Sequence, residues 1–108
     1  SVTLPSDWQK LVCNLLVVGA ECLPRGGGLR LDVLHGGRIG IEVLARGEGA
    51  QLNPHARAAM APEAPIEDLT TRTVQAYLTA RLAQHLGAAI SVSSTLDGGV
   101  LLGAALHV

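Results

Sequence analysis

Apolar residues follow a helical spacing in the first part of the chain. A helix is predicted to begin after Pro5, with Ser6 or Asp7 as its N-cap, and to continue to about Cys22. Its apolar side chains occupy most of the helix circumference, so we expect neighbouring elements to cover it on more than one face. Pro24 and the glycine run that follows it predict where this helix ends.

Apolar and polar residues alternate with period two in other segments, which is typical of strands with one buried face. Such alternation on both sides of a glycine pair at 36–37 predicts a β-hairpin over residues 29–44. Residues 89–94 and 100–108 predict a second hairpin, in which alternate residues of the last strand point to the same side. Residues 1–4 have the character of the end of a further strand.

Two helices are predicted between the hairpins. An Asn-Pro pair at 53–54 gives a cap and a first turn for a short helix that reaches about Met60. A longer helix, capped by Thr70 or Thr71, is predicted to reach about Leu86. Its apolar stripe comprises Val74, Leu78 and Leu82. The order of elements predicts a two-layer α/β (α+β) sandwich, in which helices cover one face of a sheet.

The composition is that of one compact domain. The chain has 108 residues, 48% of them hydrophobic and 16% charged, which excludes a disordered segment and allows a single core. A formal net charge of −1 and the presence of only two aromatic residues, Trp8 and Tyr77, argue against nucleic-acid binding. The longest apolar run, residues 11–20, is about half the length of a membrane-spanning helix. With two unpaired cysteines and no export signal, we expect a cytoplasmic protein without membrane contact.

Residues of the first helix and residues after the first hairpin form a pattern of candidate chemistry. At about 100° per residue, Asn14, Val18 and Glu21 lie on one narrow face of the helix. After the hairpin, the chain reads Ala-Arg-Gly-Glu-Gly over residues 45–49. A third segment, residues 71–76, begins the long helix and contains no glycine. The glycine segment is weak evidence when taken alone, and its value lies in its spacing from Asn14 and from the helix at Thr71.

These segments resemble the ATPase-type domain of histidine kinases, in the degenerate copy found in ChpT-type bacterial histidine phosphotransferases. The resemblance implies that the face of Asn14, Val18 and Glu21 corresponds to a kinase surface where two asparagines and a basic residue meet Mg²⁺ and the phosphates. Val18 offers no oxygen to a cation that needs about six oxygen ligands, and Glu21 would repel the phosphates. The resemblance also implies a histidine-kinase ATPase-like fold with a mixed sheet of about five strands.

The second and third segments have lost chemical groups in the same way. Ala45 stands where the resemblance places an aspartate that reads adenine, although Gly47 and Gly49 of that segment remain. The third segment lacks the glycines whose bare backbone amides cradle phosphate. We therefore predict that the chain binds no nucleotide, other cofactor or metal and has no catalytic residue. What remains is a vestigial pocket of Asn14, Val18, Glu21, Ala45, Gly47 and Gly49.

The resemblance further implies a role in a phosphorelay. Such proteins take a phosphoryl group from one receiver domain of two-component signalling and pass it to another, through a histidine on a helical hairpin that also forms a homodimer. That hairpin is absent from this sequence, so residues 1–108 are expected to be a single non-catalytic C-terminal domain, with the hairpin upstream of Ser1. Its expected partners are response-regulator receiver domains and a hybrid histidine kinase.

The sequence leaves two other functions open. The chain could be an active ATP-binding kinase-type domain that uses altered residues, or an anti-sigma-like module that binds a protein without phosphotransfer. No acidic residue follows any histidine, so we expect structural or surface roles for all four, which are His35, His55, His85 and His107. Arg57, Arg72 and Arg81 could present a positive face to the acidic pocket of a receiver domain.

Overall fold

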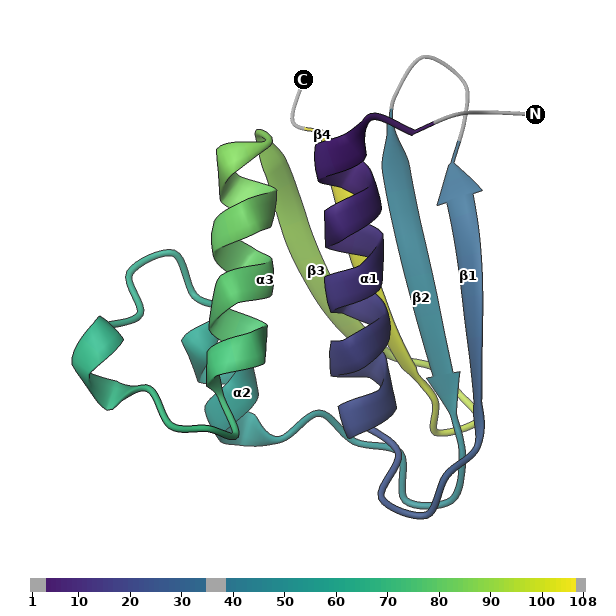
Figure 1. The fold of residues 1–108 in the computed structure, drawn as a ribbon. Coiled ribbons are helices and arrows are strands. Elements are labelled where there is room, and N and C mark those ends of the chain that lie inside the picture. Colours follow the sequence, from purple (N-terminus) through teal and green to yellow (C-terminus); the bar gives the residue numbers. More distant parts are fainter. Residues whose placement is uncertain (1–3, 35–38, 107–108) are drawn as a thin grey trace.

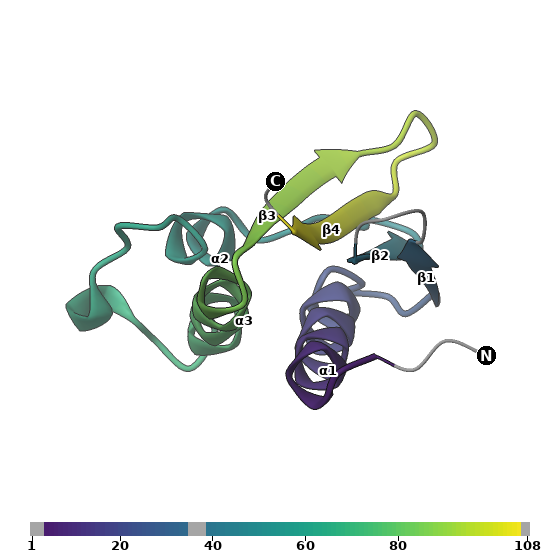
Figure 2. The ribbon, with the colours of Figure 1, turned by 90° about the horizontal axis from the view of Figure 1, so that it is seen from above.

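The computed structural model describes residues 4–34 and 39–106 and places two long helices on one face of a single sheet (Figure 1). In chain order the elements are α1 (Ser6–Glu21), β1 (Gly28–Leu34), β2 (Gly40–Arg46), α2 (Pro54–Ala59), the short 3₁₀ helix η1 (Ile66–Asp68), α3 (Val74–His85), β3 (Ala88–Ser94) and β4 (Val100–Leu106). Figure 2 shows α1 and α3 side by side, with α2 next to α3. Within the described residues, none of the helices combines the length and the apolar character that crossing a membrane requires.

The sheet has four strands in the order β1-β2-β4-β3, and each neighbouring pair is antiparallel. Both predicted hairpins are therefore confirmed, but the prediction of a mixed sheet of five strands is wrong for the described residues. β2 and β3 run in the same direction, yet β4 lies between them and opposes both, so no parallel pair forms. The predicted strand end over residues 1–4 falls mainly outside the described residues, as does the turn at 36–37, and Leu4 belongs to no strand.

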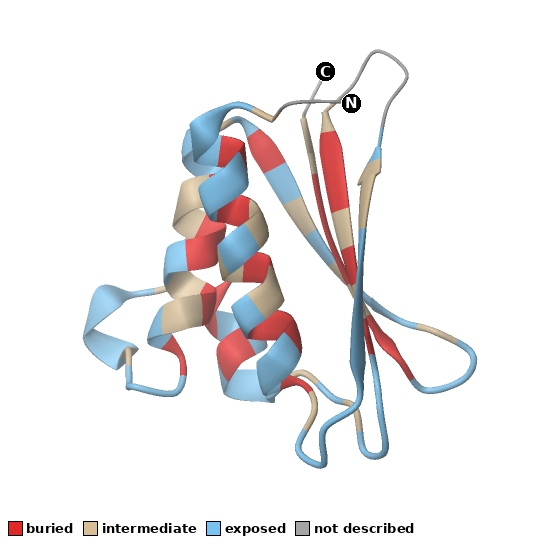
Figure 3. Cartoon of the chain, turned by 45° about the vertical axis from the view of Figure 1, so that its right-hand side comes forward, coloured by how far each residue is buried: buried red, intermediate tan, exposed pale blue. Residues whose placement is uncertain are grey.

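The main core lies between the sheet and α1. Strand register puts Val43 between Leu31 and Leu102 on the side of the sheet that faces the helices. The fully buried residues of α1 and its C-cap that pack there are Leu11, Leu15, Val18 and Cys22. Figure 3 shows buried residues on the surfaces that helices and sheet turn toward each other. In β4, Val100, Leu102 and Ala104 of the predicted side are buried, Leu106 is half-buried, and Gly103 of the other side is buried too. Each fully buried leucine stabilises the fold by about 1.5–3 kcal/mol.

The helix starts agree with the sequence predictions in part. α1 begins at Ser6 without a side-chain cap, so the N-cap predicted at Ser6 or Asp7 is wrong. The carbonyl of Pro5 accepts the first helical hydrogen bond there. α2 begins as predicted, because Oδ1 of Asn53 accepts a hydrogen bond from the backbone N–H of His55 at 2.7 Å.

Helix α3 buries a stripe that differs from the predicted one, of which only Leu82 packs against the core. Val74 and Leu78 are 37% and 50% exposed. The buried residues are small and comprise Ala76, Thr79, Ala80 and Ala83. Small side chains allow α3 to lie close to α1, α2 and β3 at once, and this close packing decides which stripe faces inward. The helix itself begins at Val74, and the predicted cap Thr70 instead caps the turn before it, where its hydroxyl accepts from the N–H of Arg72 at 3.2 Å.

Candidate functional site

The vestigial pocket draws its residues from α1, from the end of β2 and from the loop that follows β2. Helix α1 and strand β2 finish at the same end of the molecule, at the bottom of Figure 1. Val18 and Ala45 belong to one core cluster, whereas Glu21, Gly47 and Gly49 are exposed. The structure thus brings most of the predicted residues to one region, but divides them between the protein interior and its surface.

Asn14 is engaged by the neighbouring helix. Its side-chain oxygen accepts a hydrogen bond from Nε2 of Gln75 at the start of α3, at 3.1 Å. The two residues are 61 positions apart, so no local motif points to their contact. The bond ties α1 to α3 at the place where the resemblance puts Mg²⁺, and it uses the oxygen of the asparagine on this helix face.

Val18 and Ala45 are core residues with no exposed surface. Ala45 lies in register between Leu29 and Val100, on the side of the sheet that faces the helices. An aspartate here would place a carboxylate among apolar side chains, which is costly without a partner. Cys22, near the end of α1, is also fully buried, and burial raises the pKa of its thiol to about 11. The side chains of this region therefore serve packing.

Gly47 and Gly49 have structural reasons to be glycine. A Cβ at Gly47 would overlap the carbonyl oxygen of Gly26, because the loop after β2 crosses the loop between α1 and β1. Gly49 has a φ of +74°, which other residues adopt only with strain. The backbone N–H of Gln51 donates to the carbonyl of Cys22 at 2.9 Å and fastens the two loops together. The glycine spacing that resembles a nucleotide-binding loop follows from this crossing.

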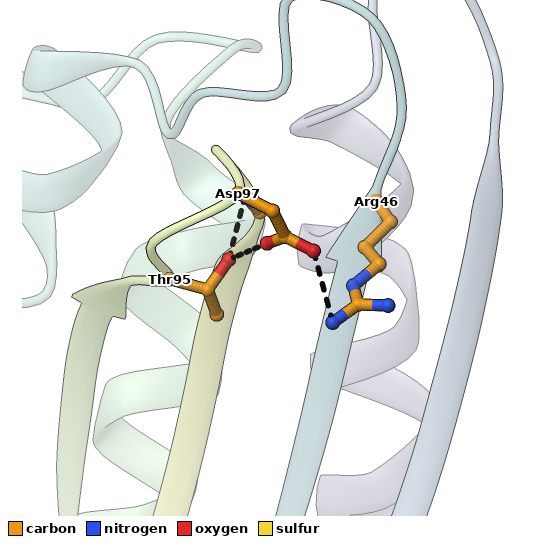
Figure 4. A network of polar contacts seen from close by, with 4 residues as sticks. Arg46, Thr95 and Asp97 are labelled. Carbon is orange, nitrogen blue, oxygen red and sulfur yellow. Dashed lines mark hydrogen bonds and ion pairs between the residues drawn. The ribbon is translucent and has the colours of Figure 1, made fainter.

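Two charged residues near the loop crossing, Arg46 at the end of β2 and Glu48 in the loop that follows, form ion pairs. Oε1 of Glu48 lies 3.0 Å from Nη1 of Arg25 across the crossing loops. Arg46 contacts the carboxylate of Asp97 in the β3–β4 turn at 3.0 Å (Figure 4). The hydroxyl of Thr95 donates to Asp97, and this hydrogen bond, together with the charge of Arg46, lowers the pKa of Asp97 below its ordinary value of 3.8. Both ion pairs lie at the protein surface and join segments that are distant in the sequence.

The backbone amides at the start of α3 are also used within the protein. The N–H groups of Thr73 and Val74 donate to the carbonyl oxygen of Thr70 at 3.1 and 3.0 Å. The N–H of Arg72 donates to the hydroxyl of Thr70, and the N–H of Thr70 donates to the hydroxyl of Thr73 at 3.0 Å. A phosphate at a glycine-rich helix start binds to free N–H groups of this kind. Here threonine oxygens accept from four amides that precede or begin α3, those of Thr70, Arg72, Thr73 and Val74.

A cavity of about 440 Å³ lies between α2 and the connection that leads to α3. None of the six residues of the vestigial pocket lines it. Its charged and titratable lining residues are His55, Asp68 and Arg72, and the others are Asn53, Ala58, Ala59, Ala64, Pro65, Leu69, Thr70 and Thr73. Sequence analysis missed this cavity because no motif connects the two segments that form its walls.

The structure separates the three arginines that could have formed one positive face. Arg81 donates to the carbonyl oxygens of residues 61–62 at 2.9 and 3.1 Å and lies over the ring of Tyr77. Arg57 donates to the carbonyl of Val92 in β3 at 3.3 Å. Arg72 lines the cavity. Two of the three guanidinium groups thus have structural partners, and the sequence shows no sign of these contacts to distant backbone groups.

The structure describes two of the four histidines. His55 is exposed in α2, and His85 is exposed in the last turn of α3. His35 and His107 lie outside the described residues. In the part of the chain that the structure describes, no three His, Cys, Asp or Glu side chains come together in a group that could hold a metal ion.

The architecture is similar to that of a bacterial phosphotransferase solved at 1.7 Å. The two structures match with a TM-score of 0.81 over 95% of this chain and 50% of that chain, and their sequences are 28% identical. The chain therefore has the fold of one part of that phosphotransferase.

The sequence comparisons are more specific. The histidine phosphotransferase C-terminal domain matches residues 1–98, and the chain belongs to this family. Protein phosphotransferase ChpT of Brucella abortus (strain 2308) is 31% identical over 98 residues, which amount to 89% of this chain and 46% of ChpT. The chain thus spans about half the length of the relatives it matches. These findings confirm the predicted membership of the ChpT-type C-terminal domains.

Proposed function

We propose that this chain is a non-catalytic, nucleotide-free domain of a phosphorelay histidine phosphotransferase, with a degenerate ATPase-like fold. One observation carries the proposal: contacts within the protein occupy all three positions where the resemblance expects nucleotide contacts. Asn14 is bonded to Gln75, Ala45 lies in the core, and the amides before α3 donate to threonine oxygens. A nucleotide with its metal would have to compete with these contacts and would find no acceptor for its base at Ala45.

The phosphoryl chemistry is proposed to belong to a helical hairpin outside residues 1–108. The family match to a C-terminal domain and the shared length, 46% of ChpT and 50% of the solved chain, support this division. The hairpin would carry the phosphoaccepting histidine and form the homodimer. The whole protein would then pass phosphoryl groups, in the cytoplasm, from the receiver domain of a hybrid histidine kinase to that of a response regulator.

The part of this domain in the relay is proposed to be docking of the receiver domain. The residues that we call the helix stripe are Val17 of α1, which is 46% exposed, and Val74 and Leu78 of α3. They lie within one helical turn of the bonded pair Asn14 and Gln75, so the helices that present them are tied together. Apolar side chains on a rigid surface are typical anchors of a protein interface.

Calorimetric titration with ATP and Mg²⁺ tests the nucleotide-free state. We expect no binding heat at nucleotide concentrations up to about 1 mM, which excludes affinities in the range that kinase-type domains would need. Micromolar binding that depends on Mg²⁺ would favour the active kinase-type alternative and would contradict the proposal. Thermal unfolding with and without nucleotide is the second readout, because a ligand that binds the folded state raises the melting temperature.

Titration of a labelled chain with a response-regulator receiver domain tests the docking role. Leu78→Ser is expected to weaken binding by about tenfold, because it removes a central apolar anchor. The matched control is Leu96→Ser, since Leu96 is a fully exposed leucine in the β3–β4 turn, away from the helix stripe. Equal effects of the two variants, or no effect of Leu78→Ser, would place docking elsewhere.

A further inference from the structure

The two edges of the sheet are not equivalent. At one edge β3 packs beside α3, and Arg57 of α2 donates to the carbonyl of Val92 in that strand. At the other edge β1 pairs with β2 alone within the described residues, and Figures 1 and 2 show it as the outermost strand. Alternate residues among its seven therefore present a row of backbone N–H and C=O groups that can pair with another strand.

The sequence of β1 complements itself when two copies run antiparallel. With Leu31 at the centre, Arg30 lies opposite Asp32 of the second copy, and Leu29 lies opposite Val33. The Arg–Asp pair occurs twice, and opposite charges in facing positions stabilise a strand pair. On the other side of the strand, Leu29 and Leu31 are each 39% exposed and would gain contacts with the apolar residues of the second copy.

We propose that two copies of this chain associate by antiparallel pairing of their β1 strands, with a two-fold axis at Leu31. The two sheets would then form one continuous sheet. Strands spaced by about 4.8 Å put the two β2 strands roughly 14 Å apart. Because α1 packs mainly on β2 and packed helices need about 8–10 Å between their axes, the two α1 helices have room on this shared face.

The charges that this pairing uses are available at the surface. In one copy, Nε of Arg30 lies 3.2 Å from the carboxylate of Asp32 on the same strand, and the two side chains are 73% and 47% exposed. Such a surface pair is weak, so exchange for the corresponding groups of a second copy costs little.

Sedimentation equilibrium of the 108-residue chain tests this association, with an expected mass of twice 11.1 kDa at tens of micromolar. Arg30→Asp sets aspartates opposite each other at both symmetric positions, and Asp32→Arg does the same with arginines. Each change is expected to weaken association by about tenfold. A mixture of the two variants is expected to associate again, because each aspartate then faces an arginine. In that mixture neither strand can form its own ion pair, so recovery reports on the contact between copies alone.

Arg25→Asp is the matched control, because it makes the same charge change at an exposed arginine in the loop before β1. It is expected to leave the dissociation constant unchanged. Hydrogen exchange gives an independent readout: alternate amides of β1 should become protected as protein concentration rises, even in a less stable variant. A monomer at about 1 mM, a dimer that both single variants retain, or a mixture that associates no better than its components would overturn the proposal.

Discussion

The end of the molecule where α1 and β2 finish differs from the outer face of α1 and α3. At that end, most of the residues that resemble a nucleotide motif have a packing role or a partner, as Ala45 in the core and Gly47 at the loop crossing show. On the outer face, Val17, Val74 and Leu78 are apolar and exposed, and no motif includes them. The difference shows that likeness to a binding motif and availability for binding are separate properties.

The largest expected effect comes from returning a carboxylate to the motif. Ala45→Asp should destabilise the fold by about 4 kcal/mol or more at neutral pH, because it buries an ionised group among apolar side chains. Burial raises the pKa of such a carboxyl above its unfolded value, so the loss should be smaller at acidic pH and should grow as pH rises. Urea denaturation at several pH values measures it.

Ala89→Asp is the control for this substitution, because Ala89 is exposed in β3 and the change should cost about 1 kcal/mol or less. If Ala45→Asp were as stable as the parent chain and bound ATP, a single substitution would restore nucleotide binding at the end of the molecule where α1 and β2 finish. The contrast between the two regions would then collapse.

A smaller effect is expected at the loop crossing. Gly47→Ala should destabilise the protein by about 2–3 kcal/mol, because its Cβ would overlap the carbonyl oxygen of Gly26 and force the loops apart. Gly28→Ala is the control, since a Cβ there meets no atom within 4 Å. Equal denaturation midpoints for the two variants would show that the crossing does not require glycine, and that the motif spacing needs another explanation.

Much of the fold could be predicted from the sequence, because hydrophobic period and turn residues are local signals. Both hairpins and α2 were predicted for this reason. Membership of the family was predicted from the resemblance of three short segments. The buried stripe of α3 was predicted wrongly, because Ala76 and Ala83 are buried by close packing against several elements, which a search for large apolar residues overlooks. The contact of Asn14 with Gln75 and the cavity beside α2 depend on segments far apart in the chain, and only the fold brings them together.

The bond between Asn14 and Gln75 is expected to contribute about 1 kcal/mol to stability. A double-mutant cycle with Asn14→Ala and Gln75→Ala, read by urea denaturation, measures the coupling between the two side chains. Additive effects would contradict the view that this bond closes the site. Neither variant is expected to gain Mg²⁺-dependent ATP binding, because Val18 and Ala45 still offer no polar group.

The smallest effect concerns the β3–β4 turn. The lowered pKa of Asp97 means that its contribution to the turn is present above pH 3.8 and is lost as pH falls through the lower folded value. Because the Thr95 hydrogen bond is the main cause, Thr95→Val should raise the pKa of Asp97 more than Arg46→Gln does, as measured by carboxyl NMR titration. A larger shift from Arg46→Gln would mean that the ion pair dominates. Arg46 would then be held beside Asp97 chiefly by its charge, and a phosphate could compete with Asp97 for this arginine.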